Sequence, residues 1–529
     1  MQVPLTPIRC LYRSVDLYPH KVGVVSGSCR YTYAQFGERC ERLAAGLVAE
    51  GIQPGDRVAY LSFNNNQLLE GYYGVPLMRG IVMPLNVRLQ PAELIAILNH
   101  ADARMLVFEN DFAPCVDSLR QACPGIRRFV AIDGPVPQAD FPLEELLSRG
   151  RLDRPDLFSF QENEIAELFY TSGSTGTPKG VMLSHRTVFM HALLIGTTGI
   201  CDDNTVELHT IPLFHANGWG RPQTATMFGT KQIMVRRFDP ALVLRLIQEE
   251  RVTSFAVVPT MANALLNCPE LGRFDVSSAK EIFIGGAAAS VELIERMEQA
   301  FGCHVQVGYG LTETSPVATT ARPKSTVQFA GEQDRLRHQA MAGWPIPGCE
   351  ARVVDLHMHD VPRDMESVGE VVVRGDNVMD GYFREPEATK AVMSDGWLHT
   401  GDMAVWDAEN RIQIVDRKKD IIISGGENIS SIEVEKAIFA HPAVLECAVV
   451  AAPDPKWGEV PVAIVVVKPD QQLGEEQLTA FLMERLAKFK LPRIVEFTEG
   501  PLPKTGTGKI LKRELRETFW QGRARRVQG

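Results

Sequence analysis

The chain has 529 residues, of which 45% are hydrophobic and 23% charged, a balance typical of an ordinary soluble globular protein with more than one domain. Its formal net charge of -10 is small for this length and disfavours nucleic acid as a general partner. The ten cysteines include no C-x-x-C pair, no apolar run is long enough to span a membrane, and the N-terminus lacks the pattern of a secretory signal. We therefore expect a cytoplasmic location and no membrane span.

Strand-like runs alternate with helical patterns along most of the chain, which indicates α/β layers. Ser290 is the predicted N-cap of one helix, whose apolar face carries Val291, Ile294 and Phe301. The pattern predicts strands at 56–62, 253–259 and 281–286, a helix at 66–77, and a smaller β-rich unit at 351–355 and 368–375.

The pattern changes after the charged stretch DRKKD, residues 416–420, and a compact α+β domain of about a hundred residues is predicted there. Ser430 and Glu433 have the spacing of a capping box at the start of a short helix. The basic tail KRELRETFWQGRARR is expected to form a solvated final helix, with a contact to a CoA phosphate or a membrane as the alternative. The other predicted elements are strands at 445–453 and 460–469 and a helix with Leu478, Phe481, Leu482 and Leu486 in one stripe.

The stretch YTSGSTGTPKG, residues 170–180, places three glycines, three threonines and two serines around Lys179. Ordinary surface loops often have this composition, but apolar runs on both sides predict buried strands and a tight connection. Bare backbone, hydroxyl donors and one positive charge favour a phosphate-binding loop. It is not a P-loop, because Pro178 replaces the second glycine and Gly180 follows the lysine. The segment GYGLTE is no dinucleotide fingerprint either, since Glu313 replaces its third glycine.

Four further segments carry candidate polar groups. Glu313 in GYGLTET is a possible Mg2+ ligand, although the segment also suits a turn before a helix. Asp402 in WLHTGD either accepts hydrogen bonds from a ribose or marks a turn. Gly425 and Gly426 suit a turn or a ligand that passes close to the backbone. Lys509 in PLPKTGTGKI, taken alone, is typical of a solvated lysine.

In their order along the chain, YTSGSTGTPKG, GYGLTET, WLHTGD, DRKKDIIISGGENIS and PKTGTGK resemble the motifs of the adenylate-forming family. This family includes acyl-CoA synthetases, nonribosomal adenylation domains and firefly luciferase, and the resemblance spans about residues 31–512. It implies an α/β fold in which a large N-terminal domain of two α/β sheets and a distorted β-barrel precedes a small mobile α+β domain. We expect these domains at 1–417 and 418–529.

The resemblance also implies a nucleotide site. Glu313 and Thr171 would bind Mg2+ and act in catalysis, and Lys509 would be the decisive catalytic residue, reaching the carboxylate and the α-phosphate. Asp402 and Arg417 would hold the ribose. The implied ATP-binding residues are Thr171, Ser172, Gly173, Ser174, Thr175, Gly176, Thr177, Lys179, Gly285, Gly286, Ala287, Ala288, Gly308, Tyr309, Gly310, Thr312, Asp402, Arg417 and Lys509.

The implied reaction has two steps and uses ATP, Mg2+ and coenzyme A. A carboxylate attacks ATP to give acyl-AMP and pyrophosphate, and CoA then displaces AMP to give acyl-CoA. Between the steps the small domain would rotate about a hinge at Lys419. Ser424, Gly425 and Gly426 would then line the CoA channel.

The sequence constrains the identity of the substrate acid only partly. His215 follows Phe214 at the position where amino-acid-activating relatives carry Asp, so an α-amino acid is not expected. Similarity to medium- and long-chain acyl-CoA ligases favours a fatty acid, with aryl and short branched acids as alternatives. His215 is otherwise a satisfied buried histidine. The implied acyl pocket consists of His215, Asn217, Gly218, Trp219 and Gly310.

Other functions stay open at this point. A separate carrier protein is an alternative acceptor to CoA, and a non-catalytic nucleotide-binding protein is a third possibility. The non-catalytic alternative is disfavoured because the chain carries all of the expected polar site residues, Glu313, Asp402, Arg417 and Lys509. Peripheral membrane contact and a homodimer are also open. One departure from the family pattern is Thr507, where Ser or Ala is usual.

Overall fold

The computed structural model describes residues 2–171, 178–199, 201–424, 427–469, 471–504 and 510–520. It divides into two compact units: unit 1 is Met1–Ala351 with Val373–Leu398, and unit 2 is Arg352–Val372 with His399–Gly529. The mixed α/β fold with a large N-terminal and a small C-terminal part is confirmed. Unit 2 includes residues 352–372 and 399–417, so the domain boundary expected after residue 417 stays a prediction.

One sheet of unit 1 is parallel at its centre and antiparallel at both ends. Its strand order is β16-β15-β14-β13-β12-β10-β11-β1-β2. Its central strands are short and largely buried, and they include polar as well as apolar side chains. The strands are β1 (Val22–Ser26), β2 (Cys29–Thr32), β10 (Val206–His209), β11 (Lys231–Met234), β12 (Ser254–Val257), β13 (Glu281–Ile284), β14 (His304–Gly310), β15 (Val317–Thr320) and β16 (Trp344–Pro345).

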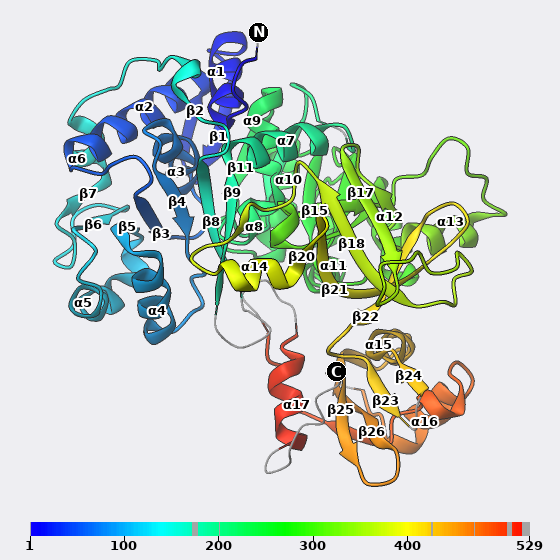
Figure 1. Ribbon diagram of the computed structural model, residues 1–529. Coiled ribbons are helices and arrows are strands. Elements are labelled where there is room, and N and C mark those ends of the chain that lie inside the picture. The colour runs from blue at the N-terminus through cyan, green and yellow to red at the C-terminus, as the bar shows by residue number, and fades with distance from the viewer. Residues whose placement is uncertain are drawn as a thin grey trace. The chain divides into compact units, whose positions relative to one another are not determined.

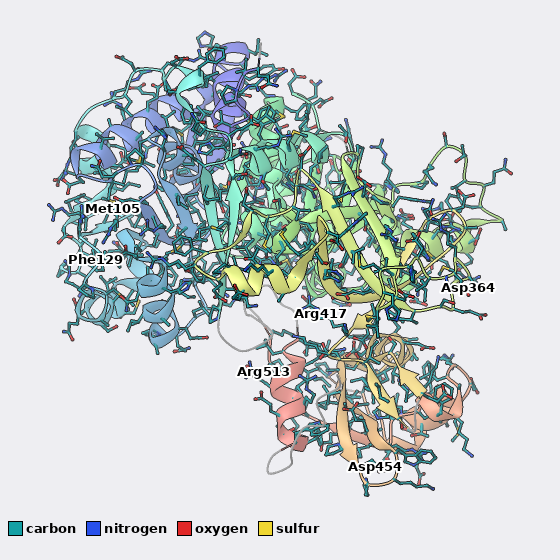
Figure 2. All side chains as sticks on the ribbon, viewed as in Figure 1. Met105, Phe129, Asp364, Arg417, Asp454 and Arg513 are labelled. Carbon is teal, nitrogen blue, oxygen red and sulfur yellow. The ribbon has the colours of Figure 1, made fainter. Side chains whose placement is uncertain are left out.

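A second sheet of unit 1 has the order β19-β9-β8-β4-β3-β5-β6-β7. The predicted strands around the phosphate loop are confirmed, because β8 and β9 form an antiparallel pair in which Thr171 faces Lys179. Figure 2 labels Met105 and Phe129, two buried residues on the neighbouring strands β5 and β6. The strands are β3 (Arg57–Leu61), β4 (Ile81–Pro84), β5 (Ala103–Phe108), β6 (Arg128–Ala131), β7 (Phe141–Pro142), β8 (Ile165–Thr171), β9 (Lys179–Ser184) and β19 (Gly381–Tyr382).

Helices fill the space between these sheets. Helices α2 and α3 contact β1 of the first sheet, and α3 also contacts β3, β4 and β8 of the second (Figure 1). The predicted cap of α12 is confirmed, since the Ser290 hydroxyl accepts from Leu293 N at 3.1 Å. The helices of unit 1 are α1 (Pro7–Leu17), α2 (Tyr33–Ala49), α3 (Asn66–Leu77), α4 (Pro91–Ala101), α5 (Ala113–Ala122), α6 (Leu143–Ser148), α7 (His185–Gly196), α8 (Ala216–Trp219), α9 (Arg221–Phe228), α10 (Pro240–Glu250), α11 (Pro259–Leu266), α12 (Val291–Phe301), α13 (Glu332–Gln339) and α14 (Pro386–Val392).

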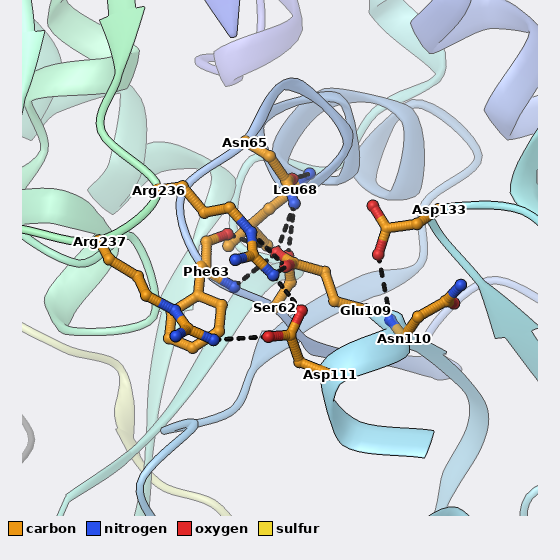
Figure 3. A network of polar contacts seen from close by, with 10 residues as sticks. All are labelled: Ser62, Phe63, Asn65, Leu68, Glu109, Asn110, Asp111, Asp133, Arg236 and Arg237. Carbon is orange, nitrogen blue, oxygen red and sulfur yellow. Dashed lines mark hydrogen bonds and ion pairs between the residues drawn. The ribbon is translucent and has the colours of Figure 1, made fainter. Parts of the chain in front are cut away.

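A polar network ties the two sheets together near the carboxyl ends of β3, β5 and β11 (Figure 3). The buried Glu109 accepts from Ser62 Oγ at 2.8 Å and Asn65 Nδ2 at 2.7 Å, and Arg236 Nε donates to it at 2.8 Å. Arg236 also pairs with Asp111. These carboxylates lie close to a third, that of Asp133, but Arg236 pairs with the first two and Arg237 also pairs with Asp111, so we interpret the cluster as structural.

The β-rich region predicted from 351–355 and 368–375 forms a sheet, in which β21 runs antiparallel to β20 and to β22. Its order is β17-β18-β21-β20, and β22 pairs with β21. The strands are β17 (Cys349–Val354), β18 (Gly369–Gly375), β20 (Met393–Ser394), β21 (Trp397–Trp406) and β22 (Ile412–Arg417).

The C-terminal part of unit 2 is the predicted α+β arrangement. Its sheet has the order β24-β23-β26-β25, with β27 beside β26. The elements are β23 (Ile422–Ser424), β24 (Glu427–Ile429), β25 (Val444–Asp454), β26 (Gly458–Val467), β27 (Ile494–Phe497), α15 (Ser431–Phe439), α16 (Glu475–Met483) and α17 (Lys512–Trp520).

Three predictions for this part need correction. Ser430 caps α15, but the Glu433 carboxylate pairs with Lys490 at 2.7 Å instead of closing a capping box. Helix α16 ends at Met483, so Leu486 packs on the core from the turn that follows. Helix α17 is not simply solvated, because Arg516 is buried and donates to the carbonyl oxygen of Lys419 at 2.9 Å.

Candidate active site

The ends of the predicted phosphate loop are held by the β8–β9 pair. Thr171 ends β8 and Lys179 begins β9, while Ser172, Gly173, Ser174, Thr175, Gly176 and Thr177 lie outside the described residues. The ammonium of Lys179 lies 4.8 Å from the ring centroid of Tyr382, which is a cation–π contact. Tyr382 belongs to β19, the strand that pairs with β9.

Glu313 lies on the short 3-10 helix η4 (Thr312–Thr314) and is also joined to Tyr382. The Tyr382 hydroxyl donates to Glu313 Oε1 at 2.8 Å, and Met379 N donates to the Glu313 carbonyl oxygen at 2.8 Å. Burial and the nearby Glu313 raise the pKa of the Tyr382 phenol, so it remains a hydrogen-bond donor. The structure therefore brings together Lys179 and Glu313 through an aromatic residue that the sequence analysis missed.

This arrangement fits the binding of a divalent cation and phosphate. Mg2+ prefers carboxylate oxygens and keeps several waters, so a carboxylate fixed through one oxygen is a suitable ligand. A ligand carboxylate is commonly held by a second hydrogen-bonding residue, which is the position of Tyr382 beside Glu313. Thr312, which was predicted to contact phosphate, is buried next to Glu313.

Two glycines of the predicted nucleotide site lie where other parts of the chain pack closely against them. A Cβ on Gly310 would overlap the carbonyl oxygen of Pro316, and one on Gly308 would overlap the ring of Phe283. These two glycines are therefore required by packing. Gly285 and Gly286 follow β13, with Gly286 at a positive φ of 78°, and Ala287 and Ala288 are exposed before α12. Tyr309 is half-buried on β14.

The predicted acyl-pocket segment has an unusual backbone. The φ angles are 43° at Ala216, 44° at Asn217, 59° at Gly218, 63° at Trp219 and 69° at Gly220. Residues other than glycine rarely adopt this left-handed conformation, and its strain persists only where the surroundings hold it. His215, the residue before this run, is half-buried.

Two buried residues hold this left-handed segment. The Glu167 carboxylate on β8 accepts from Asn217 Nδ2 at 3.0 Å and from Gln223 Nε2 at 2.8 Å. Burial raises the pKa of Glu167 to about 7, although both amides lower it. The ring of His191 packs so closely against Gly220 that a Cβ there would overlap it. Glu167 was also missed, although an acidic residue within an apolar strand is a recognisable signal.

The predicted ribose residues are paired in unit 2. Asp402 on β21 faces Arg417 on β22, and Arg417 Nε donates to the buried Asp402 Oδ1 at 3.1 Å (Arg417 is labelled in Figure 2). Lys419 follows β22, and burial lowers the pKa of its ammonium. Ser424 ends β23, whereas Gly425, Gly426 and Lys509 lie outside the described residues.

Comparison with known proteins identifies this arrangement. The family model described as AMP-binding enzyme matches residues 11–383, and that described as AMP-binding enzyme C-terminal domain matches residues 433–509. The chain belongs to the AMP-binding enzyme family. The resemblance to adenylate-forming enzymes is thereby confirmed, in the acyl-CoA synthetase branch.

Three similar proteins define the class of this AMP-binding enzyme. It is 40% identical to a long-chain-fatty-acid–CoA ligase of Thermus thermophilus, with 93% of this chain and 90% of that protein covered. It is 36% identical to 4-hydroxybutyrate–CoA ligase 2 of Metallosphaera sedula, with 97% and 94% covered. The crystal structure of the anthranilate CoA ligase AuaEII in complex with anthranoyl-AMP has a TM-score of 0.89 at 25% identity, with 98% of each chain covered.

The family and these relatives make the chain an AMP-forming acid–CoA ligase, which uses ATP and CoA. Within the ranges that the structure describes, no helix combines the length and apolar character required to cross a bilayer.

Proposed function

We propose that this AMP-binding enzyme activates a medium- or long-chain fatty acid as acyl-AMP and transfers the acyl group to coenzyme A. The proposal rests on one observation. The Lys179 ammonium lies over the ring of Tyr382, and the hydroxyl of the same tyrosine donates to Glu313. Tyr382 thereby connects the end of the predicted phosphate-binding loop to a carboxylate suited to Mg2+. The attack of one anion on another requires positive charge of this kind nearby.

In the first step, the substrate carboxylate attacks the α-phosphorus of ATP, and the bond to pyrophosphate breaks. Lys179 would offset charge on the phosphates, and Glu313 with Thr171 would hold Mg2+, which supplies further positive charge when bound. Lys509 would stabilise the charge that develops between the carboxylate and the α-phosphate. The remaining loop residues, 172–177, would supply hydroxyl and backbone N–H donors.

The roles proposed for unit 2 concern the ribose and the second step. Asp402 and Arg417 would hold the ribose hydroxyls, exchanging part of their mutual ion pair for ligand contacts. Rotation at Lys419 would then let Ser424, Gly425 and Gly426 line a path for the CoA thiol, which attacks the acyl carbon and releases AMP.

A fatty acid is favoured over other acids for two reasons. His215 stands where a carboxylate would be needed to bind the ammonium group of an α-amino acid. The relative that is 40% identical carries the name of a long-chain-fatty-acid ligase. The anthranilate ligase with a similar fold makes an aryl acid the second candidate, since Trp219 and Phe283 form an aromatic wall with centroids 5.9 Å apart.

The proposal extends to location and assembly. We infer a cytoplasmic location because all ten cysteines, each within the described residues, are free thiols. Homodimer formation would be measured by light scattering, and peripheral membrane contact by cosedimentation with lipid vesicles.

The test is ATP–pyrophosphate exchange with a panel of acids from acetate to palmitate, together with benzoate and cinnamate. Fatty acids of medium or greater length should give the highest kcat/KM, and omission of Mg2+ should abolish exchange. Product analysis with CoA and with a carrier protein then identifies the acceptor. The highest kcat/KM with benzoate or cinnamate would contradict the proposed substrate class.

A further inference from the structure

Helix α17 begins three residues after Lys509 and uses two of its faces for contacts within unit 2. Leu515 and Phe519 lie on an apolar face, which packs on buried apolar side chains of β25 and β26. Lys512 and Arg516 are also four residues apart, so they share a second, basic face. The apolar contact would dock the helix on the sheet by itself, and the basic face therefore has a separate role.

The basic face of α17 is fastened to two other parts of unit 2. Arg516 is buried and donates to the carbonyl oxygen of Lys419 at 2.9 Å and to Asp420 Oδ1 at 3.1 Å. Lys512 Nζ pairs with Glu435 Oε1 on α15 at 2.8 Å. Burial disfavours the charge on Lys512, but nearby carboxylates, Glu435 first among them, outweigh this effect and raise its pKa. Both basic groups are therefore charged and paired.

The chemistry of these contacts suits positioning better than stabilisation. Taking a cation out of water is costly unless it is paired, and apolar residues of similar volume often stabilise a fold equally well. A planar guanidinium, in contrast, fixes the direction of each group that it contacts. Arg516 reaches a backbone carbonyl and a carboxylate at once, and both belong to the residues of the proposed hinge, Lys419 and Asp420.

These contacts all lie on the same side of the proposed hinge. A rotation about the backbone bonds of Lys419 carries its carbonyl group, Asp420 and the residues that follow as one body. Glu435 belongs to that body as well. Arg516 and Lys512 therefore join α17 to groups that move together with it, and their contacts can persist in both orientations of the small domain.

Described residues on both sides of Lys509 contact each other. Ile510, the next residue, forms an antiparallel bridge with Lys504, and Leu511 N donates to the carbonyl oxygen of Pro503 at 2.8 Å. The chain then runs directly into α17, so a shift of this helix moves the residues next to Lys509. The placement of α17 relative to the hinge thus sets where this lysine can reach.

We propose that Arg516 and Lys512 are positioning residues, which hold α17 against the hinge so that Lys509 reaches the reacting carboxylate and the α-phosphate during adenylation. The inference rests on the roles proposed for Lys509 and Lys419 and adds how the one is tied to the other. A reacting group that is misplaced by about 1 Å can lose about a hundredfold in rate, so a small slack in α17 has a large effect.

The experiment measures the two half-reactions separately in Arg516→Met and Lys512→Met, which remove the charge and keep an unbranched side chain. With the acid that gives the highest kcat/KM in the exchange panel, acyl-adenylate formation in a single turnover should slow by about tenfold or more, at a nearly unchanged KM for ATP. Thioester formation from supplied acyl-AMP should stay within about twofold of the native rate, because Lys509 is not used in that step. Arg516→Lys keeps the charge but not the two-pronged geometry and should lose less.

Arg513→Met is the matched control. Arg513 is a basic residue of the same helix, labelled in Figure 2, and it is exposed and pairs with Glu517 at 2.7 Å one turn along the helix. An exposed pair of this kind contributes little, so this variant should leave both half-reactions unchanged.

A double variant separates positioning from a general loss of structure. If Arg516 acts through Lys509, adding Arg516→Met to Lys509→Ala should cause no further loss of adenylate formation. A general loss of structure would multiply with the effect of Lys509→Ala and would slow thioester formation too. Thioester formation by the same preparation shows that each variant is folded, and Arg516→Lys gives the same comparison if Arg516→Met does not fold.

Two results would overturn the inference while leaving the proposed function intact. One is a native rate of adenylate formation in folded Arg516→Met. The other is an Arg516→Met effect that multiplies with that of Lys509→Ala or is equal in both half-reactions. If Lys509→Ala itself slows both half-reactions equally, the role proposed for Lys509 fails and this inference fails with it.

Discussion

Glu167 allows a direct test of how the left-handed segment 216–220 is held. Its carboxylate is fully buried on β8 and accepts hydrogen bonds from the amides of Asn217 and Gln223. The amide oxygens of these two residues have no hydrogen-bond partner among the described residues. Both hydrogen-bond donors to the Glu167 carboxylate are therefore neutral amides. Because burial outweighs their effect, the pKa of Glu167 is raised from 4.5 to about 7.

The sign of the stability effect follows from this pKa. The folded protein holds the Glu167 proton up to about pH 7, whereas the unfolded chain releases it near 4.5. Stability is therefore fully present below pH 4.5 and is lost as the pH rises to about 7. At about 1.4 kcal/mol per pH unit, the loss amounts to about 3 kcal/mol.

Glu167→Gln should remove this dependence, because the amide has the same shape, stays neutral and can donate to one of the unpaired amide oxygens. At pH 5 the variant and the native protein should unfold at similar temperatures. At pH 8 the variant should be more stable by up to about 3 kcal/mol, which corresponds to a few degrees in the midpoint for a unit of this size.

Thermal unfolding of both proteins at pH 5, 6, 7 and 8 measures this difference. Glu298→Gln is the control with the opposite sign. Burial there raises the pKa, but hydrogen bonds from His304, Arg335 and Gln339 outweigh it and hold the pKa well below its usual range. That variant should lose stability at neutral pH. A midpoint difference for Glu167→Gln that is constant from pH 5 to 8, or that favours the native protein at pH 8, would refute the reasoning.

Three further predictions concern the reaction. Tyr382→Phe removes the donor to Glu313 and should raise the Mg2+ concentration needed for half-maximal pyrophosphate exchange by about tenfold or more, whereas an unchanged Mg2+ titration would show that this contact is not used. Lys509→Ala should slow acyl-adenylate formation by about a hundredfold or more while thioester formation from supplied acyl-AMP largely survives, and equal losses in both half-reactions would contradict the assignment. Lys419→Pro should stop thioester formation but spare adenylation, with Lys419→Ala as the control, and full thioester turnover in the proline variant would exclude this hinge.

The strands beside residues 172–177 and the start of α12 could be predicted from the sequence because they depend on local signals. The apolar runs before and after residues 172–177 predict the strands that became β8 and β9, and Ser290 predicts the start of α12. Such signals need only residues close together in the chain. They do not reveal that Arg516 is the buried basic residue of α17, because neighbouring arginines in that tail have the same local pattern.

The site residues missed by the sequence depend on contacts between distant segments. Tyr382 belongs to the site because β19 pairs with β9 and carries the phenol to Glu313. A single tyrosine in GYF has no periodicity that indicates this position. Glu207, Arg221 and Glu281 likewise come from two strands and a helix, and only the fold brings them to the lining of one small cavity.

The left-handed segment, which we propose as part of the acyl pocket, also depends on contacts with distant residues. Two residues of this left-handed segment, 216–220, are held from outside it: Glu167 accepts a hydrogen bond from the Asn217 amide, and the His191 ring leaves room only for glycine at 220. The indole of Trp219, between these two positions, lies against Gly285 and lines a small cavity. If this segment lines the acyl pocket as proposed, a change in either support would move the pocket wall, and we expect the choice of acid to vary while Lys179, Glu313 and Tyr382 stay in place.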